Sequence, residues 1–365
     1  MNAEQMYAVN FEELADTIAD IGPKITVLAE GDMGIGKTTV LKMLAKKLGS
    51  EYTPCYFDCT TKDLGDVTIP NIAKLDDGTG FVRYLTNEEL GVHLNKPIIL
   101  MIDEYGKANR AVKNALLRPM LERKIGSYTM HPKSIVFATT NKGAENVGDS
   151  LEAHQRNRIA VMRVRKPTAE EWIVNFALPN ALHTAVVGFV NEFQQVLQSY
   201  EDVKNPADNQ YIFHPQQERA AFITPRSLEA ASIILQDGIN MSDNAKYSAL
   251  IGAIGRAGAL DLMAFVQLAN ELPRLDDIRN SPETAIVPQG SSACVMTVSK
   301  IIGSMDKQLV GPAMTYLPRL RTEAQAMFIQ TVIKQDYAFK REITTHASFG
   351  KWARDNQFLF TADKI

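Results

Sequence analysis

The chain has few cysteines and no long apolar run. Its 365 residues contain only three cysteines, Cys55, Cys59 and Cys294, which excludes a disulfide framework and indicates a reduced, intracellular protein. No uncharged apolar run reaches the roughly 20 residues needed to cross a bilayer. The N-terminus also lacks the basic start and apolar segment of a secretory signal. We therefore expect a cytoplasmic protein with no membrane partner.

The chain also lacks a strong charge of either sign. Its formal net charge of −3 gives no overall attraction to nucleic acid or anionic lipid, although this average would hide a local basic channel in an oligomer. With 45% hydrophobic and 22% charged residues, the composition is that of a globular protein able to bury a core. A chain of this length exceeds what one core usually supports, so we expect two or three compact units.

Short β-rich runs alternate with helical patterns in the first part of the chain. Several of these runs are almost continuously apolar, as expected for parallel strands that helices cover on both faces. The alternation predicts an α/β domain with a parallel sheet over residues 1–166. The predicted strands are KITVLAE (24–30), CYFDCT (55–60), PIILMID (97–103), SIVFATTN (134–141) and IAVMRV (159–164).

The connection between the second and third strands is too long for a plain loop. Its DDGTG turn, from Asp76, predicts an inserted hairpin at about residues 62–92. From Pro167 onward the periodicity is almost entirely helical, and the best candidate break is NSPETAIVPQGSSACV, from Asn280. The predicted helical segments lie near 168–178, 181–200, 227–238, 246–270 and 313–335.

A glycine-rich loop follows the first predicted strand and opens a predicted helix. Its glycines let backbone N–H groups close around phosphates, and the helix presents its positive N-terminal end. Lys37 is expected to neutralise the β and γ oxygens, and the Thr38 hydroxyl to bind Mg²⁺. The motif predicts a nucleoside triphosphate site formed by Gly31, Asp32, Met33, Gly34, Ile35, Gly36, Lys37, Thr38 and Thr39.

An acidic pair ends the third predicted strand. Parallel sheets bind ligands at the carboxyl ends of their strands, where Asp103 and Glu104 stand. Asp103 is expected to hold Mg²⁺, and Glu104 to orient and deprotonate the attacking water. This pair favours hydrolysis over phosphoryl transfer to another substrate.

Two short stretches also fit a GTPase. DEYG matches D-x-x-G, and TNKGAE begins like the guanine-reading N-K-x-D. Ala144 stands where the aspartate that contacts guanine would be, and its side chain cannot accept a hydrogen bond. This mismatch favours adenine.

Three further polar residues have both a structural and a functional interpretation. Asn141 is either a turn residue or a group that reaches the attacking water. Arg158, with Arg156 nearby, is either a surface arginine or a finger that reaches a neighbouring subunit's nucleotide. Arg226, after Pro225 at a predicted helix start, either is exposed or senses the γ phosphate.

Taken together, these stretches resemble the AAA+ ATPases over about residues 24–270, and within them the MoxR-like group. The motifs follow one another in the family's order: Walker A (31–38), Walker B (98–104), sensor 1 at Asn141, an arginine finger at Arg158 and sensor 2 at Arg226. That order favours the functional interpretation of all three residues. KDLGD with GFVRY resembles the group's insert hairpin, whereas Lys107 stands where relatives often have arginine. RNRIAVMRVRKPTAEEWIVNFA with ITPRSL resembles a subgroup encoded by bacteria and their viruses.

The resemblance implies a specific fold and assembly. It implies a sheet of order 5-1-4-3-2, a helical lid at 167–275, a helical extension at 276–365, and a homo-hexameric ring with ATP and Mg²⁺ between subunits. It further implies ATP hydrolysis coupled to chaperone-like remodelling of a protein partner, often with a von Willebrand factor A domain protein. The alternatives are a nucleic-acid motor or loader, a GTP-using relative, and a regulatory ring with slow turnover. Acidic residues outnumber basic ones in the 62–92 insert, which disfavours nucleic acid.

Overall fold

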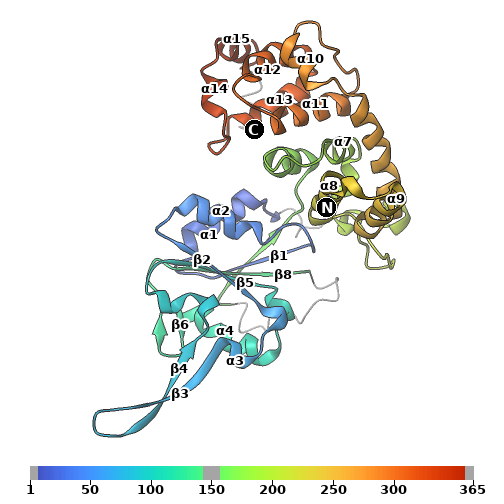
Figure 1. Cartoon of the computed structure of the whole chain (residues 1–365). Coiled ribbons are helices and arrows are strands. Elements are labelled where there is room, and N and C mark those ends of the chain that lie inside the picture. The colour runs from blue at the N-terminus through green and yellow to red at the C-terminus, as the bar shows by residue number, and fades with distance from the viewer. Residues whose placement is uncertain (1–6, 143–156, 358–365) are drawn as a thin grey trace. The chain divides into compact units, whose positions relative to one another are not determined.

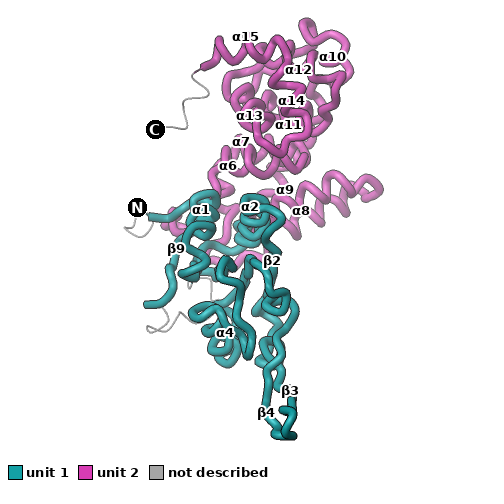
Figure 2. Tube along the Cα trace, turned by 90° about the vertical axis from the view of Figure 1, so that its left-hand side faces the viewer, with its two compact units in different colours: residues 1–166 teal, residues 167–365 magenta. Residues whose placement is uncertain are grey.

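The computed structural model describes residues 7–142 and 157–357 (Figure 1). The chain separates into two compact units, Met1–Lys166 and Pro167–Ile365, which are coloured separately in Figure 2. This division falls where alternating strands and helices give way to purely helical periodicity.

A five-stranded sheet organises the first unit, with strand order β2-β5-β8-β1-β9. All of its pairs are parallel, so the carboxyl ends of the strands lie along one edge. Counted by order in the chain, the arrangement is 5-1-4-3-2, which confirms the predicted fold class. The strands are β1 (Val27–Gly31), β2 (Thr53–Asp58), β5 (Ile98–Asp103), β8 (Ile135–Thr140) and β9 (Ala160–Val164).

Helices cover both faces of this sheet (Figure 1). Helices α1 (Phe11–Ile21) and α2 (Thr39–Leu48) pack on one face, where they form a core with Ile99 and Met101 of β5. Helix α4 (Arg110–Glu122) packs on the other face, against Leu100 and Ile102. Because both faces are buried, β5 is a continuous apolar run rather than an alternating one.

The first helix begins at a capping box. The N–H of Glu13 donates to Asn10 Oδ1 at 2.9 Å, and the N–H of Asn10 donates to Glu13 Oε2 at 2.8 Å. Such a cap contributes about 1 kcal/mol. It positions the buried side chains of Leu14 and Ile18 against the sheet.

The insert is a hairpin, as predicted. After the short helix α3 (Leu64–Val67), β3 (Thr68–Lys74) and β4 (Gly80–Thr86) pair antiparallel from Thr68↔Thr86 to Lys74↔Gly80. The ribbon extends away from the sheet in Figure 1. A second, small hairpin, β6 (Lys124–Ile125) with β7 (Tyr128–Thr129), follows α4.

The second unit is helical and has one continuous hydrophobic cluster, which runs from Ala169 to Trp352. The boundary expected at residues 275 and 276 falls inside this cluster. The helices are α6 (Ala169–Trp172), α7 (Thr184–Glu192), α8 (Pro225–Asp237), α9 (Asp243–Glu271), α10 (Leu275–Asn280), α11 (Ser291–Gly303), α12 (Val310–Tyr316), α13 (Thr322–Val332), α14 (Lys340–Thr344) and α15 (Ala347–Asp355).

Two predicted helices of this unit are wrong in extent. The segment predicted at 313–335 is two helices, α12 and α13, because Pro318 lies in a 3₁₀ turn between them and lacks an amide proton to continue the first. The segment predicted at 181–200 is helical only as α7. The backbone of this segment departs from helical dihedral angles at Phe193, and the ring of Phe193 packs edge-on against Tyr211 and Phe265.

Helix α9 is interrupted. Gly255 has φ 79° and ψ 163°, and a Cβ at this position would lie 2.8 Å from Ala221 O, so only glycine fits. The stretch Asp243–Asn280 is long and apolar enough to cross a membrane by length and composition, a test that core helices of globular proteins also pass. Here Ile254 and Leu262, on either side of the break, belong to the core of the second unit.

Candidate nucleotide site

The glycine-rich loop connects β1 to α2 at the carboxyl edge of the sheet. Gly34 and Gly36 have φ values of 69° and 100°, which side chains other than glycine rarely adopt. The buried Lys37 turns back into the loop, where Nζ donates to Gly31 O at 2.8 Å and to Asp32 O at 2.9 Å. The ammonium group is therefore held at the centre of the phosphate-binding loop.

Asp103 ends β5 opposite the loop. Its Oδ2 accepts a hydrogen bond from the Tyr56 hydroxyl at 2.8 Å and lies 3.5 Å from the Thr38 hydroxyl. Its Oδ1 accepts from the Thr139 hydroxyl and, at 3.1 Å, from the N–H of Glu104. The carboxylate is thus fixed in orientation, with one oxygen directed at the start of α2.

Glu104 has a left-handed backbone, with φ 52° and ψ 38°. This conformation is unfavourable for a residue with a Cβ and is concentrated at functional sites. It places the carboxylate next to Asn141, whose Nδ2 donates to Glu104 Oε2 at 3.1 Å. Lys107 Nζ lies 3.2 Å from the same oxygen, so Lys107 contacts the predicted base.

Asn141 joins the two halves of the site. It follows β8, the strand beside β1, and its Oδ1 accepts a hydrogen bond from Lys37 Nζ at 2.6 Å while its Nδ2 donates to Glu104. Lys37, Asn141 and Glu104 therefore form a continuous hydrogen-bonded chain across the carboxyl edge. The chain connects the phosphate-binding loop to the predicted base.

The loop itself contains a buried aspartate. Asp32 is only 3% exposed, and its carboxylate pairs with Lys142 at 2.7 Å and with Lys166 at 3.8 Å. Lys142 directly follows Asn141, and Lys166 is the last residue of the first unit. Two cations around one buried carboxylate offset its desolvation, which would otherwise be costly.

The residues present fit a magnesium nucleotide. The Thr38 hydroxyl and the Asp103 carboxylate are hard oxygen donors on facing elements, the type of ligand that Mg²⁺ prefers. Lys37 and the glycine conformations of the loop suit a β,γ-phosphate group. We therefore assign Thr38 and Asp103 as the residues that would hold Mg²⁺.

Of the residues predicted to act in catalysis or to bind Mg²⁺, the structure brings together Lys37, Thr38, Asp103, Glu104 and Asn141. The others lie elsewhere. Arg158 is exposed just before β9 and thus at the amino edge of the sheet, opposite the loop. Arg226 is exposed in the first turn of α8, in the second unit. Arg156 and Ala144 lie outside the described residues.

Sequence reasoning missed four residues that shape this site: Tyr56, Thr139, Lys142 and Lys166. The sequence alternation in β2 could have indicated Tyr56. Its side chain lies on the opposite face of the strand from Cys55 and Phe57, near the carboxyl edge of the sheet. No sequence pattern marked the two lysines, because only the fold shows that they pair with Asp32.

The fold and this site define a P-loop nucleotide-binding core. Residues 27–163, from β1 to β9, match the model of the ATPase family associated with various cellular activities (AAA). The match spans most of the first unit, which therefore has the fold of an AAA ATPase domain.

Solved structures of low identity also match. A protein of Cytophaga hutchinsonii described as a candidate ATPase is 13% identical over 72% of this chain and 91% of its own, with a TM-score of 0.33. A RuvB mutant of Thermotoga maritima is 14% identical, and the match covers 74% of this chain and 79% of the RuvB chain, with a TM-score of 0.38. NtrX of Brucella abortus is 14% identical, and the match covers 91% of this chain and 67% of the NtrX chain, with a TM-score of 0.31. No curated protein matches the chain.

Proposed function

We propose that this protein is a Mg²⁺-dependent ATP hydrolase of the MoxR-like AAA+ type that works as a ring and remodels a protein partner in the cytoplasm. The main observation in favour of hydrolysis is the hydrogen-bonded chain from Lys37 through Asn141 to Glu104. It places a phosphate-binding cation, an amide and a carboxylate along one edge of the sheet. A water molecule attacking the γ phosphate needs these three groups.

Each residue has one task in this mechanism. Lys37 neutralises charge on the β and γ phosphates, and the loop N–H groups bind the oxygens around it. Asn141 holds the attacking water, and Glu104 accepts its proton. Bound Mg²⁺, held through Thr38 and Asp103, would neutralise charge that develops on the phosphates. Asp103 does not need to move, because Tyr56 and Thr139 already hold its carboxylate.

The position of Arg158 supports the proposed ring. The five residues of β9 separate the amino edge from the carboxyl edge by about 16 Å, so Arg158 cannot serve its own loop. On an exposed edge it is available to a neighbouring chain's nucleotide, as the family pattern implies. Arg226, on a capped helix start, would contact the γ phosphate as the lid-borne sensor.

The insert favours a protein partner over nucleic acid. Large apolar side chains are exposed on both of its strands: Ile69, Ile72, Phe81, Val82, Tyr84 and Leu85. Exposed apolar surface on a protruding hairpin is a feature of protein-binding sites, whereas a nucleic-acid groove is basic. A von Willebrand factor A domain protein is the partner that the resemblance suggests. The two hairpins, β3–β4 and β6–β7, support the MoxR-like assignment.

The test is the Glu104→Gln variant, with Glu12→Gln on the exposed face of α1 as the matched control. Glu104→Gln should bind ATP and lose hydrolysis by at least about 100-fold, because the amide cannot accept a proton. Mass photometry should then detect particles of about six chains with ATP but not with GTP. The control should hydrolyse normally.

Three results would contradict parts of this proposal. Undiminished turnover by Glu104→Gln would remove the assigned base. ATPase stimulation by DNA or RNA with a steep salt dependence would favour the nucleic-acid motor. Very slow wild-type turnover with nucleotide-dependent assembly would favour the regulatory ring.

A further inference from the structure

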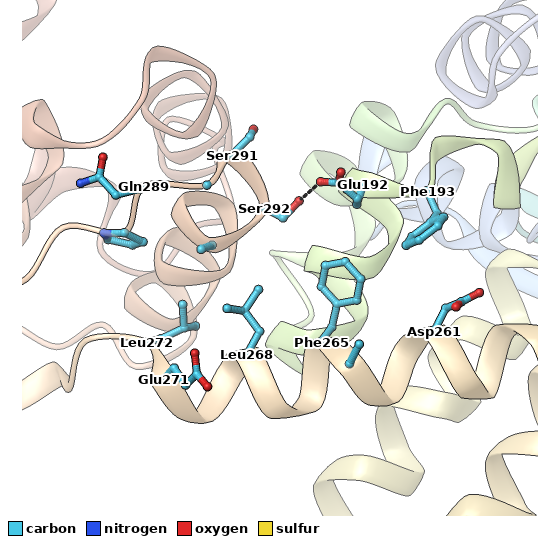
Figure 3. Close-up of a pocket in the computed structure, with 14 residues that line it drawn as sticks. Glu192, Phe193, Asp261, Phe265, Leu268, Glu271, Leu272, Gln289, Ser291 and Ser292 are labelled. Atoms are coloured by element: carbon cyan, nitrogen blue, oxygen red, sulfur yellow. Dashed lines mark hydrogen bonds between the residues drawn. The ribbon is translucent and has the colours of Figure 1, made fainter.

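The second unit contains a cavity of about 610 Å³ far along the chain from the nucleotide loop (Figure 3). Three segments line it: the end of α7, the second half of α9, and the loop that leads into α11. Its volume is in the range of ligand-binding sites. All of its lining residues belong to the second unit, so the cavity is independent of how the two units are arranged.

Helix α9 supplies one wall with a regular pattern. Phe265 and Leu268 line its middle, and Asp261 and Glu271 stand at its two ends, all on one helical face (Figure 3). At 1.5 Å of rise per residue, the two carboxylates are about 15 Å apart along the helix axis. The wall is therefore apolar in the centre and acidic at both ends.

Two of the carboxylates around the cavity are held in place. Glu192, at the end of α7, accepts a hydrogen bond from the Ser292 hydroxyl at 2.6 Å, and Asp261 accepts one from the Tyr211 hydroxyl at 2.7 Å. Each carboxylate can still accept further hydrogen bonds, because it has about four acceptor positions. Among the described residues that line the cavity, none is lysine, arginine or histidine. The site thus offers oriented acceptors without a cation of its own.

Aromatic packing makes the apolar floor rigid. The rings of Phe193 and Phe265 meet edge-on with centroids 6.1 Å apart, and Phe193 also meets Tyr211 at 6.0 Å. Such contacts fix the side chains without a ligand. A partner would therefore bind a floor that is already formed, which lowers the entropic cost of association.

A metal ion does not suit this arrangement. Nowhere in the described ranges do three or more His, Cys, Asp or Glu side chains lie close enough together to hold a metal. The carboxylates are spread over the length of the groove, and apolar side chains separate them. Nucleic acid would be repelled by the same carboxylates. The complementary occupant has cationic groups about 15 Å apart and apolar side chains between them.

We propose that this cavity is a docking groove for a protein segment with the pattern basic, apolar, basic. Lysine or arginine side chains of the segment pair with Asp261 and Glu271 at the two ends, and with Glu192 on the facing wall. Large apolar side chains between them bury against Phe265 and Leu268. The required spacing corresponds to about ten residues of helix or about five residues of extended chain.

The test uses a fluorescent peptide of about ten residues with arginine at each end and leucine and phenylalanine between, measured by anisotropy against the full-length protein. A variant with Glu192→Gln, Asp261→Asn and Glu271→Gln keeps side-chain shape and removes the charges. A matched control neutralises three exposed carboxylates elsewhere in the same unit: Glu218→Gln, Glu323→Gln and Asp355→Asn. No ATP is present, so the result does not depend on the proposed ATPase activity.

We expect saturable binding that the groove variant weakens about tenfold and the control leaves unchanged. Ala264→Trp, which fills the groove without changing its charge, should also weaken binding. The proposal is overturned if the groove variant and the control bind equally well, or if the wild type shows no binding. Equal binding of a peptide with serine in place of leucine and phenylalanine would also overturn it, since the apolar floor would then contribute nothing.

Discussion

The hydroxyl of Tyr56 donates a hydrogen bond of 2.8 Å to Oδ2 of Asp103, the oxygen that also faces the Thr38 hydroxyl. The two residues come from neighbouring strands, β2 and β5, which pair so that Asp58 lies beside Asp103. Tyr56 therefore reaches across from one strand to orient the carboxylate on the next. Removal of a partner of this kind typically costs about 10- to 100-fold in metal affinity or activity.

Tyr56→Phe should weaken the use of Mg²⁺ more than it weakens catalysis. The phenyl ring keeps the packing, while Asp103 loses one of the hydrogen bonds that orient it. We expect the Mg²⁺ concentration for half-maximal ATPase activity to rise about tenfold, with kcat at saturating Mg²⁺ largely retained. Titration of activity with MgCl₂ at constant free ATP measures both quantities.

Tyr84→Phe is the matched control, because Tyr84 is an exposed tyrosine on the insert hairpin. Its Mg²⁺ requirement should equal that of the wild type. An unchanged requirement in Tyr56→Phe would show that the tyrosine does not position Asp103 during turnover.

Arg158→Ala and Lys37→Ala should complement each other when mixed. Each variant alone lacks one component of every site, so both should be inactive. In a mixed ring, an intact loop from one chain can face an intact Arg158 from another, and equal random mixing should restore about a quarter of the activity. A steady-state ATPase assay across mixing ratios measures this recovery.

Lys24→Ala is the control for Arg158→Ala, since Lys24 is another exposed cation at the amino edge of the sheet. It should retain full activity. If the mixture of the two inactive variants stays inactive although the chains exchange, Arg158 does not act on a neighbour's nucleotide.

His183 should make the second unit less stable in mild acid. It precedes α7, and its Nδ1 accepts a hydrogen bond from the Ala185 N–H at 3.2 Å, which requires an unprotonated nitrogen. Burial lowers the pKa of His183 from its ordinary value of 6.5. Below pH 6.5 the unfolded chain therefore binds a proton that the folded chain excludes. Its stabilising contribution is complete above pH 6.5 and declines by at most about 1.4 kcal/mol per pH unit below it.

His183→Asn separates this effect from general acid sensitivity. Asparagine also caps helices but does not titrate, so the variant should lose less stability than the wild type between pH 7.5 and pH 5.5, by about 1 kcal/mol. Urea unfolding followed by circular dichroism at both pH values measures the difference. Equal pH dependence in the two proteins would contradict the role assigned to His183.

Most of the α/β core was predictable from local patterns. The strands that form the sheet are short apolar runs bounded by turn residues. The glycine loop was recognisable because its chemistry requires a fixed spacing. The helical half was harder, because a continuous 3.6-residue periodicity does not reveal an interruption such as the one at Gly255. That break depends on the carbonyl of Ala221, which is distant in the sequence.

The sequence by itself determined the parallel α/β core, the loop that holds phosphates and the acidic pair at the end of β5, since each depends on neighbours along the chain. Only the tertiary structure decided which distant groups meet. It brought Tyr56 to Asp103, placed two lysines on Asp32, and assembled the acidic groove of the second unit from three segments. The physical reason is that hydrogen bonds and ion pairs act over a few ångströms in space, and sequence patterns carry no direct record of such contacts between distant residues.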